Sequence, residues 1–257
     1  MNHTLTVEIA CTSLFAGMSL LSIFCYRLGR RRLKKEDTTP EVSGAIIGAA
    51  FALLGLLIAF TFSDAHTRFD ARRELIVHEA NAIGTAYLRL DLLPSHAQAS
   101  LRENFREYTA SRAALYEKLT DITAARSELA RTSALEQEIW AKALAASVGP
   151  GYQSARILLL PALNEMFDLV TARTVAIQTH PPMLIFAILF AIALACAGLT
   201  GYRASTSKHP GLYYYIIMAA ITACVLYLIL DIEYPRYGLI RLDSVNHVLI
   251  ELLETMK

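Results

Sequence analysis

Four stretches of this sequence are long and apolar enough to cross a lipid bilayer as helices. A helix needs about 20 residues to span a hydrocarbon core of about 30 Å. The candidates cover residues 5–26, 44–63, 182–202 and 212–230. The second contains no charged residue, and the fourth opens with three tyrosines, which is typical of a membrane interface. We therefore expect an integral membrane protein with four transmembrane helices.

The composition agrees with this expectation and limits the possible partners. Apolar residues make up 54% of the chain and charged residues 18%, whereas soluble domains carry about 25% charge. The net charge of +1 provides no general attraction to polyanions, so we expect no nucleic-acid partner. The four cysteines lie in the apolar stretches without metal-ligand spacing, which predicts packing residues and not a disulfide framework or a zinc site.

The segments between these stretches define the expected domain organisation. Residues 27–43 form a basic loop, residues 203–211 a short basic loop and residues 231–257 a C-terminal tail. The long segment 64–180 has apolar residues three, four and seven positions apart, the pattern of amphipathic helices. Examples are Leu101, Phe105, Tyr108, Leu115 and Leu119. We predict an all-α fold with a helical extramembrane domain inserted between transmembrane helices two and three.

Helix breakers divide this extramembrane domain. None separates residues 44 and 93, so the second apolar stretch is expected to continue as one long helix until Pro94. Two further helices are expected before Gly149-Pro150-Gly151, and one follows it with Pro161 as a kink.

The distribution of positive charge predicts the orientation. Clustered Lys and Arg residues mark cytoplasmic loops, and an even number of crossings places the two basic loops on one side. We expect a multi-pass protein of the plasma membrane, the inner membrane of a bacterium, with both termini and the central domain outside the cytoplasm. The bases are Arg27, Arg30, Arg31, Arg32, Lys34, Lys35, Arg203 and Lys208.

The sequence contains no enzyme signature that we recognise. It has no GxSxG or HExxH motif and no phosphate-binding glycine loop, and its seven histidines are scattered. His66, His78 and His180 are expected to be solvated or interfacial. We expect no catalytic residue, no metal site and no cofactor.

Three segments follow the pattern of a known family. Residues 68–94 contain Arg-Phe-Asp-Ala-Arg-Arg and then Glu-Ala-Asn-Ala-Ile-Gly-Thr-Ala-Tyr-Leu-Arg-Leu-Asp-Leu-Leu-Pro. Residues 163–168 read Leu-Asn-Glu-Met-Phe-Asp, with Arg173 behind them, and residues 230–241 read Leu-Asp-Ile-Glu-Tyr-Pro-Arg-Tyr-Gly-Leu-Ile-Arg. Together they resemble the bestrophin-like domain family of bacterial membrane proteins.

The resemblance implies a function through bestrophins, which are pentameric ion channels with four spans per subunit. It implies self-association, a pentamer by analogy, with inorganic ions and the lipid bilayer as further partners. Residues 60–69 resemble the end of the bestrophin pore-lining helix, which implies a pore lined by Ala52, Leu56 and Phe60. Two features depart from bestrophins. Their central domain is cytosolic, and the acidic clusters that bind calcium in animal bestrophins have no counterpart here.

The second apolar stretch has two interpretations. Gly44, Gly48, Gly55 and several alanines provide small faces at four-residue spacing, which predicts close helix packing. A charge-free helix around an axis also makes a hydrophobic gate that closes by dewetting. Both are compatible, because one face can pack while another lines a pore.

The polar residues that follow also have two interpretations. Arg68 and Arg72 are candidate pore-mouth charges that select ions, or they form salt bridges with Asp168, Glu165 or a neighbouring subunit. A structural polar network is expected, with its asparagines and its aspartate as buried hydrogen-bonding partners. Its members are Glu79, Asn81, Arg89, Asn164 and Asp168.

No charge lies at mid-depth in any apolar stretch, which argues against a proton relay. Glu8 lies near a membrane edge, and Asp231 and Glu233 are expected as a polar stop at the interface. Two functions remain open. The first is an ion channel, and the second is a non-conducting membrane protein whose extramembrane domain binds a partner or senses the envelope.

Overall fold

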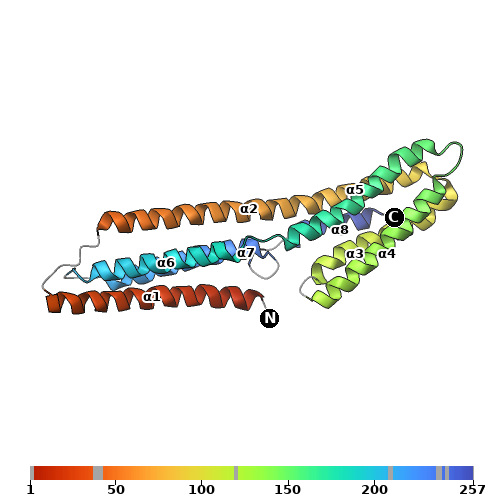
Figure 1. Ribbon diagram of the computed structural model, residues 1–257. Helices are drawn as coiled ribbons and strands as arrows, with labels where there is room; N and C mark the ends of the chain where they lie inside the picture. The colour runs from red at the N-terminus through yellow and green to blue at the C-terminus, as the bar shows by residue number, and fades with distance from the viewer. Residues whose placement is uncertain are drawn as a thin grey trace. The chain divides into compact units, whose positions relative to one another are not determined.

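The computed structural model describes residues 3–36, 43–118, 121–207, 211–235, 239–240 and 243–256. Within these residues the chain is helical and contains no strand, which confirms the all-α fold class. The elements, drawn in Figure 1, are α1 (His3–Glu36), α2 (Gly44–Leu88), a 3₁₀ turn η1 (Arg89–Leu92), α3 (Ser95–Lys118), α4 (Ile122–Ala146), α5 (Gln153–Gln178), α6 (Met183–Ala204), α7 (Leu212–Glu233) and α8 (Asp243–Thr255).

The chain divides into two compact units. Residues 1–67 and 180–240 form one, here called the apolar unit, and residues 68–179 and 241–257 form the other, here called the polar unit. Four helical segments are long and apolar enough to cross a membrane. They correspond to α1, the first part of α2, α6 and α7.

Small side chains bring α1 and α6 together in the apolar unit, where α1, α6 and α7 pack against one another (Figure 1). A Cβ atom added to Gly201 would overlap the backbone of Ser22, and one added to Gly29 would overlap Ser205. Ser22 Oγ donates a hydrogen bond to Ala197 O at 3.0 Å across the same contact. Such close approach is typical of helices packed in a bilayer, where small residues replace the hydrophobic driving force.

The segment 27–43 differs from the basic loop that was expected. Helix α1 continues to Glu36, so the bases of this segment extend the helix. Arg, Lys, Leu and Glu are good helix formers, and no proline occurs before Pro40. Arg30 Nε donates to Tyr26 Oη at 3.1 Å, one turn earlier.

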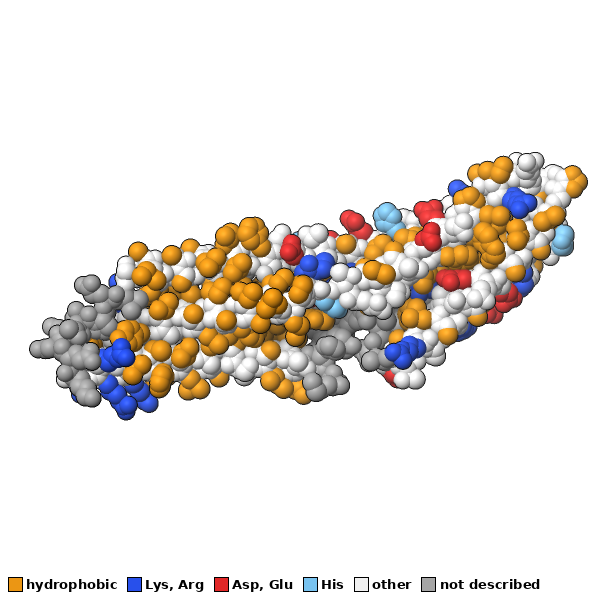
Figure 2. Space-filling view, in the orientation of Figure 1, with side chains coloured by type: hydrophobic (Ala, Val, Ile, Leu, Met, Phe, Trp, Pro, Cys, Tyr) orange, Lys and Arg blue, Asp and Glu red, His pale blue; other side chains and the backbone are white. Residues whose placement is uncertain are grey.

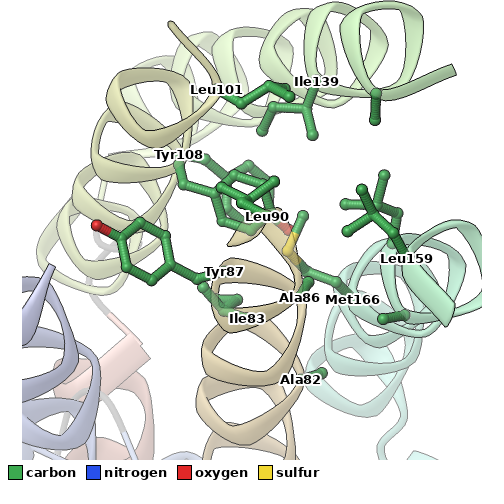
Figure 3. Close-up of a cluster of buried hydrophobic side chains, with 14 of the residues drawn as sticks. Ala82, Ile83, Ala86, Tyr87, Leu90, Leu101, Tyr108, Ile139, Leu159 and Met166 are labelled. Atoms are coloured by element: carbon green, nitrogen blue, oxygen red, sulfur yellow. The ribbon is translucent and has the colours of Figure 1, made fainter. Parts of the chain in front are cut away.

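Helix α2 runs without interruption to Leu88 and is extended by η1 to Leu92, as the absence of a breaker predicted. Its second half belongs to the polar unit. There it contributes Ile83, Ala86 and Tyr87 to a buried core with side chains of α3, α4 and α5 (Figure 3). Tyr87 meets Phe105 of α3 edge-on, with ring centroids 5.9 Å apart.

The C-terminal segment 231–257 also differs from the expected tail, because it contains α8. Leu249 and Met256 are buried in the core of the polar unit. Asn246 Nδ2 donates to Ala113 O at 3.3 Å, and Arg106 Nε donates to Met256 O at 2.6 Å. Helix α8 is amphipathic, and its apolar face needs the covering that α3 provides.

Candidate functional site

The first half of α2 is little covered within the chain. Its buried residues Ile47, Leu54 and Thr61 recur at seven-residue spacing and form one narrow stripe. The candidate pore-lining residues Ala52, Leu56 and Phe60 are exposed, and at 100° per residue they lie on the side away from that stripe. Phe60 is 61% exposed and Leu56 is 52% exposed. An apolar helix with this pattern leaves a wide apolar surface that the rest of the chain does not cover.

The glycines of α2 agree with this picture. A Cβ atom added to Gly48 or to Gly55 would have no neighbour within 4 Å. The chain itself therefore does not require glycine at these positions. This differs from Gly201 of α6, where the added atom would overlap a neighbouring backbone.

Arg72 has a structural role within the polar unit. It is 5% exposed, and its guanidinium donates to Ala176 O at 3.0 Å and to Thr179 O at 2.9 Å. These carbonyls end α5, where the helix has no further backbone donors and a positive charge is favourable. Arg68 is half-buried on the same helix.

Glu79 is the centre of a buried ion cluster. Its carboxylate is 0% exposed and accepts hydrogen bonds from Arg112 of α3 and Arg173 of α5. Burial by itself raises the pKa of Glu79, but the two guanidinium groups outweigh it and hold the pKa below its ordinary value of 4.5. The carboxylate is therefore ionised and links three helices.

A fourth charged group belongs to this cluster. Glu136 of α4 is half-buried, and its burial raises its pKa above 4.5. The negative charge of Glu79 also raises this pKa, whereas the positive charge of Arg112 lowers it. The sequence pattern did not single out Arg112 or Glu136. Arg112 lies in the apolar stripe of α3, two turns after Phe105 and one turn after Tyr108, and a charge inside such a stripe is the signal that points to it.

The expected polar network is only partly found. Arg89 donates to Leu158 O at 2.6 Å, so Arg72, Glu79 and Arg89 all connect to α5. However, Asn81, Asn164 and Asp168 are exposed on the surface of the single chain, so they are not buried partners within it. The buried face of α5 carries Leu159, Ala162, Leu163, Met166 and Arg173, and Asn164 and Asp168 lie on its other sides.

The end of α7 carries more than a polar stop. Asp231 is buried, and its carboxylate accepts the backbone N–H groups of Leu239 and Ile240 at 2.9–3.1 Å. Glu233 is also buried and meets His180 Nδ1 at 3.1 Å. His180 stacks on Tyr234, with ring centroids 4.5 Å apart. Asp231 therefore holds residues 239–240 after α7, and Glu233 contacts the segment before α6. Among the described residues, no group of three His, Cys, Asp or Glu side chains has the geometry to hold a metal ion.

Comparison with known proteins gives one family and one fold. The model of the Bestrophin-like domain family matches residues 13–246. No curated protein matches the sequence. Among solved structures, a tyrosine-to-alanine variant of a bacterial bestrophin homologue from Klebsiella pneumoniae is similar with a TM-score of 0.70 and 15% identity, covering 95% of this chain and 97% of its own.

Two further structures of bacterial bestrophin homologues from Klebsiella pneumoniae agree. A tryptophan-to-alanine variant has a TM-score of 0.70 and 16% identity, with 95% of this chain and 97% of the other covered. A structure phased with zinc has a TM-score of 0.65 and 13% identity, with 95% and 98% covered. At these identities, the likeness shows a common fold.

Proposed function

Because the chain belongs to the bestrophin-like family, we propose that it is a homo-oligomeric ion channel whose pore is lined by the first half of α2. The observation that carries this proposal is the exposed, charge-free face of α2 with Ala52, Leu56 and Phe60. Helices of this kind, arranged around an axis, form a constriction that excludes ions by dewetting. By analogy with bestrophins, we expect five subunits.

The proposed entrance charge is Arg68, which follows Phe60 by just over two helical turns. A ring of arginines at a pore mouth attracts anions and repels cations. Arg72 is not part of this proposal, because it is buried against the end of α5, whereas Arg68 is partly exposed. Glu79 and Arg89 hold α2 to the helices of the polar unit.

We also propose that the polar unit lies outside the bilayer and, from the bases of α1, on the non-cytoplasmic side. The test is a cysteine at Ser127, which is exposed on α4, in a background without the native cysteines. An impermeant thiol reagent should label it in intact spheroplasts. Labelling that requires lysis would place this unit in the cytosol, as in bestrophins.

The function is tested by conductance of the purified protein in planar bilayers. Phe60→Ala should widen and wet the constriction and raise the conductance or the open probability by about tenfold, because each 1.4 kcal/mol removed from a barrier is a factor of ten. Arg68→Glu should move the selectivity from anions toward cations.

Phe62→Ala is the matched control. Phe62 points about 200° away from Phe60 around the helix and stacks on His66, with ring centroids 6.3 Å apart. Its truncation should leave the conductance unchanged. If wild type and Phe60→Ala are both electrically silent over a broad range of salts, voltages and pH, the channel proposal fails.

A further inference from the structure

The apolar unit contains a cavity of about 180 Å³ between its helices. Its wall includes Ser22 of α1, Phe51 of α2, Thr200 of α6, and Tyr214 and Met218 of α7. Tyr214 is 60% exposed and Met218 is 42% exposed, so the cavity opens to the surface of the unit. Cavities of about 150 Å³ accommodate a molecule of the size of benzene. This cavity therefore has room for part of a hydrocarbon chain.

The wall of the cavity is apolar despite its hydroxyl groups. Ser22 Oγ donates to Ala197 O at 3.0 Å, and Thr200 Oγ1 donates to Cys196 O at 2.8 Å and to Ala197 O at 3.0 Å. Both hydroxyl protons are thus used by carbonyls of α6. A hydrocarbon chain in this cavity would therefore leave the hydroxyl groups of Ser22 and Thr200 with their hydrogen bonds.

Positive charge follows the cavity toward one end of the unit. Arg203 lies one helical turn after Thr200, and its guanidinium lies against Gly44, two turns before Phe51 on α2. On α1, the bases from Arg27 to Lys34 are exposed, and Figure 2 shows Lys and Arg side chains gathered at this end beyond the hydrophobic surface. Residues 27–43 carry six bases and three acids, and the acids all come after Lys35. The basic end therefore keeps a net positive charge.

We propose that this cavity and Arg203 form a binding site for an anionic phospholipid. One acyl chain occupies the cavity, and the phosphate meets Arg203 at the basic end of the unit. A cluster of bases at the end of transmembrane helices is the kind of surface that binds anionic lipid headgroups. The site does not depend on conduction, so it stands or fails separately from the channel.

The test is quenching of a single tryptophan by brominated lipids. In a Trp140→Phe background, Phe51→Trp places the probe in the cavity wall, and the protein is reconstituted in mixtures of brominated phosphatidylglycerol and brominated phosphatidylcholine. Quenching should give an apparent affinity about fivefold higher for phosphatidylglycerol than for phosphatidylcholine at this probe. This ratio corresponds to about 1 kcal/mol for one base near an anionic headgroup.

Two controls make the test specific. Phe24→Trp is a matched probe, because Phe24 is 61% exposed on α1 near the same basic end and outside the cavity wall. It should show a clearly smaller preference than the Phe51→Trp probe, because the exposed bases of α1 attract anionic lipid only in general. Arg203→Gln should remove the preference at the Phe51→Trp probe, whereas Arg31→Gln, at an exposed base of α1, should keep most of it. Equal quenching by both lipids at the cavity probe, or a preference that survives Arg203→Gln, would overturn the proposal.

Discussion

Where α1 meets α6 in the apolar unit, the buried polar groups are hydroxyls that return to carbonyls of α6. Where α2 meets α3 and α5 in the polar unit, they are ionised side chains, with Glu79 between Arg112 and Arg173 and with Arg72 on the end of α5. The first contact depends on how closely two backbones approach. The second depends on the balance between the positive and negative side chains that are buried together.

This difference predicts different sensitivities. Removing one member of a buried ion cluster leaves the others uncompensated, whereas adding a methyl group to a close helix contact forces the helices apart. The chain also contains a separate reporter for each unit. All four cysteines lie in the helices α1, α6 and α7, and Cys11 and Cys196 are buried, whereas the only tryptophan, Trp140, packs against the core of the polar unit.

The largest effect is expected for Glu79→Ala. It leaves the guanidinium groups of Arg112 and Arg173 buried without their carboxylate, which should destabilise the polar unit by about 3–5 kcal/mol. Unfolding in denaturant, followed by Trp140 fluorescence on the full chain in detergent, measures it. Glu74→Ala is the matched control on an exposed side of the same helix. Equal stability of the two variants would show that the ion cluster does not hold this unit.

A smaller effect is expected for Gly201→Ala in the apolar unit. The new methyl group overlaps the backbone of Ser22, and such overpacking costs about 1–3 kcal/mol. A thiol-reactive dye should therefore reach Cys11 and Cys196 at a lower temperature. Gly55→Ala, where the added atom meets open space, should leave this transition unchanged. A Trp140 transition that moves as much as the dye transition would contradict the separation of the two units.

Acid should affect the polar unit in two stages. The pKa of Glu136 is raised, so keeping its buried carboxylate ionised costs free energy in the folded unit. As pH falls toward 4.5, this carboxylate is protonated first, which removes the cost and stabilises the fold. The pKa of Glu79 is lowered, so its ionised carboxylate stabilises the folded unit above pH 4.5. This stabilisation is lost as pH falls below 4.5, by about 1.4 kcal/mol per pH unit.

The measurement is the Trp140 unfolding transition from pH 7 to pH 3. Its stability should pass through a maximum near or above pH 4.5. Glu136→Gln should remove the rise and keep the fall. If the stability of the wild type falls steadily with pH, without a maximum, the pKa of Glu136 is not raised in the folded unit.

The smallest effect on the chain itself is expected for Gly48→Leu. A Cβ atom at this position meets no other atom of the chain within 4 Å, so the thiol-dye transition of the isolated subunit should change by less than about 0.5 kcal/mol. Self-association should weaken by about tenfold if this face packs against other subunits through small residues. Native mass spectrometry measures the oligomer, and an unchanged oligomer would show that this face is not the subunit contact.

Much of the fold could be predicted from local pattern, with two exceptions. The apolar stretches and the unbroken helix from Gly44 were readable because length and breakers act locally. The extension of α1 and the helix α8 were not predicted, although residues 27–36 consist largely of helix formers and α8 is amphipathic. Helix α8 is stabilised by contacts with α3, which is far from it in the sequence. Asn246 contacts Ala113, and the carbonyl of Met256 contacts Arg106.

The candidate site shows the same division. Helical periodicity is a local property, so the sequence alone indicates that Arg72 and Glu79, seven residues apart, share a side of one long helix. The side chains that cover this side come from helices α3 and α5, which no local pattern identifies. Arg112 lies 33 residues and Arg173 lies 94 residues from Glu79, and the rotation of α3 and α5 about their axes turns these two side chains toward it. That rotation follows from the packing of whole apolar faces, such as Leu159 and Met166 against the core.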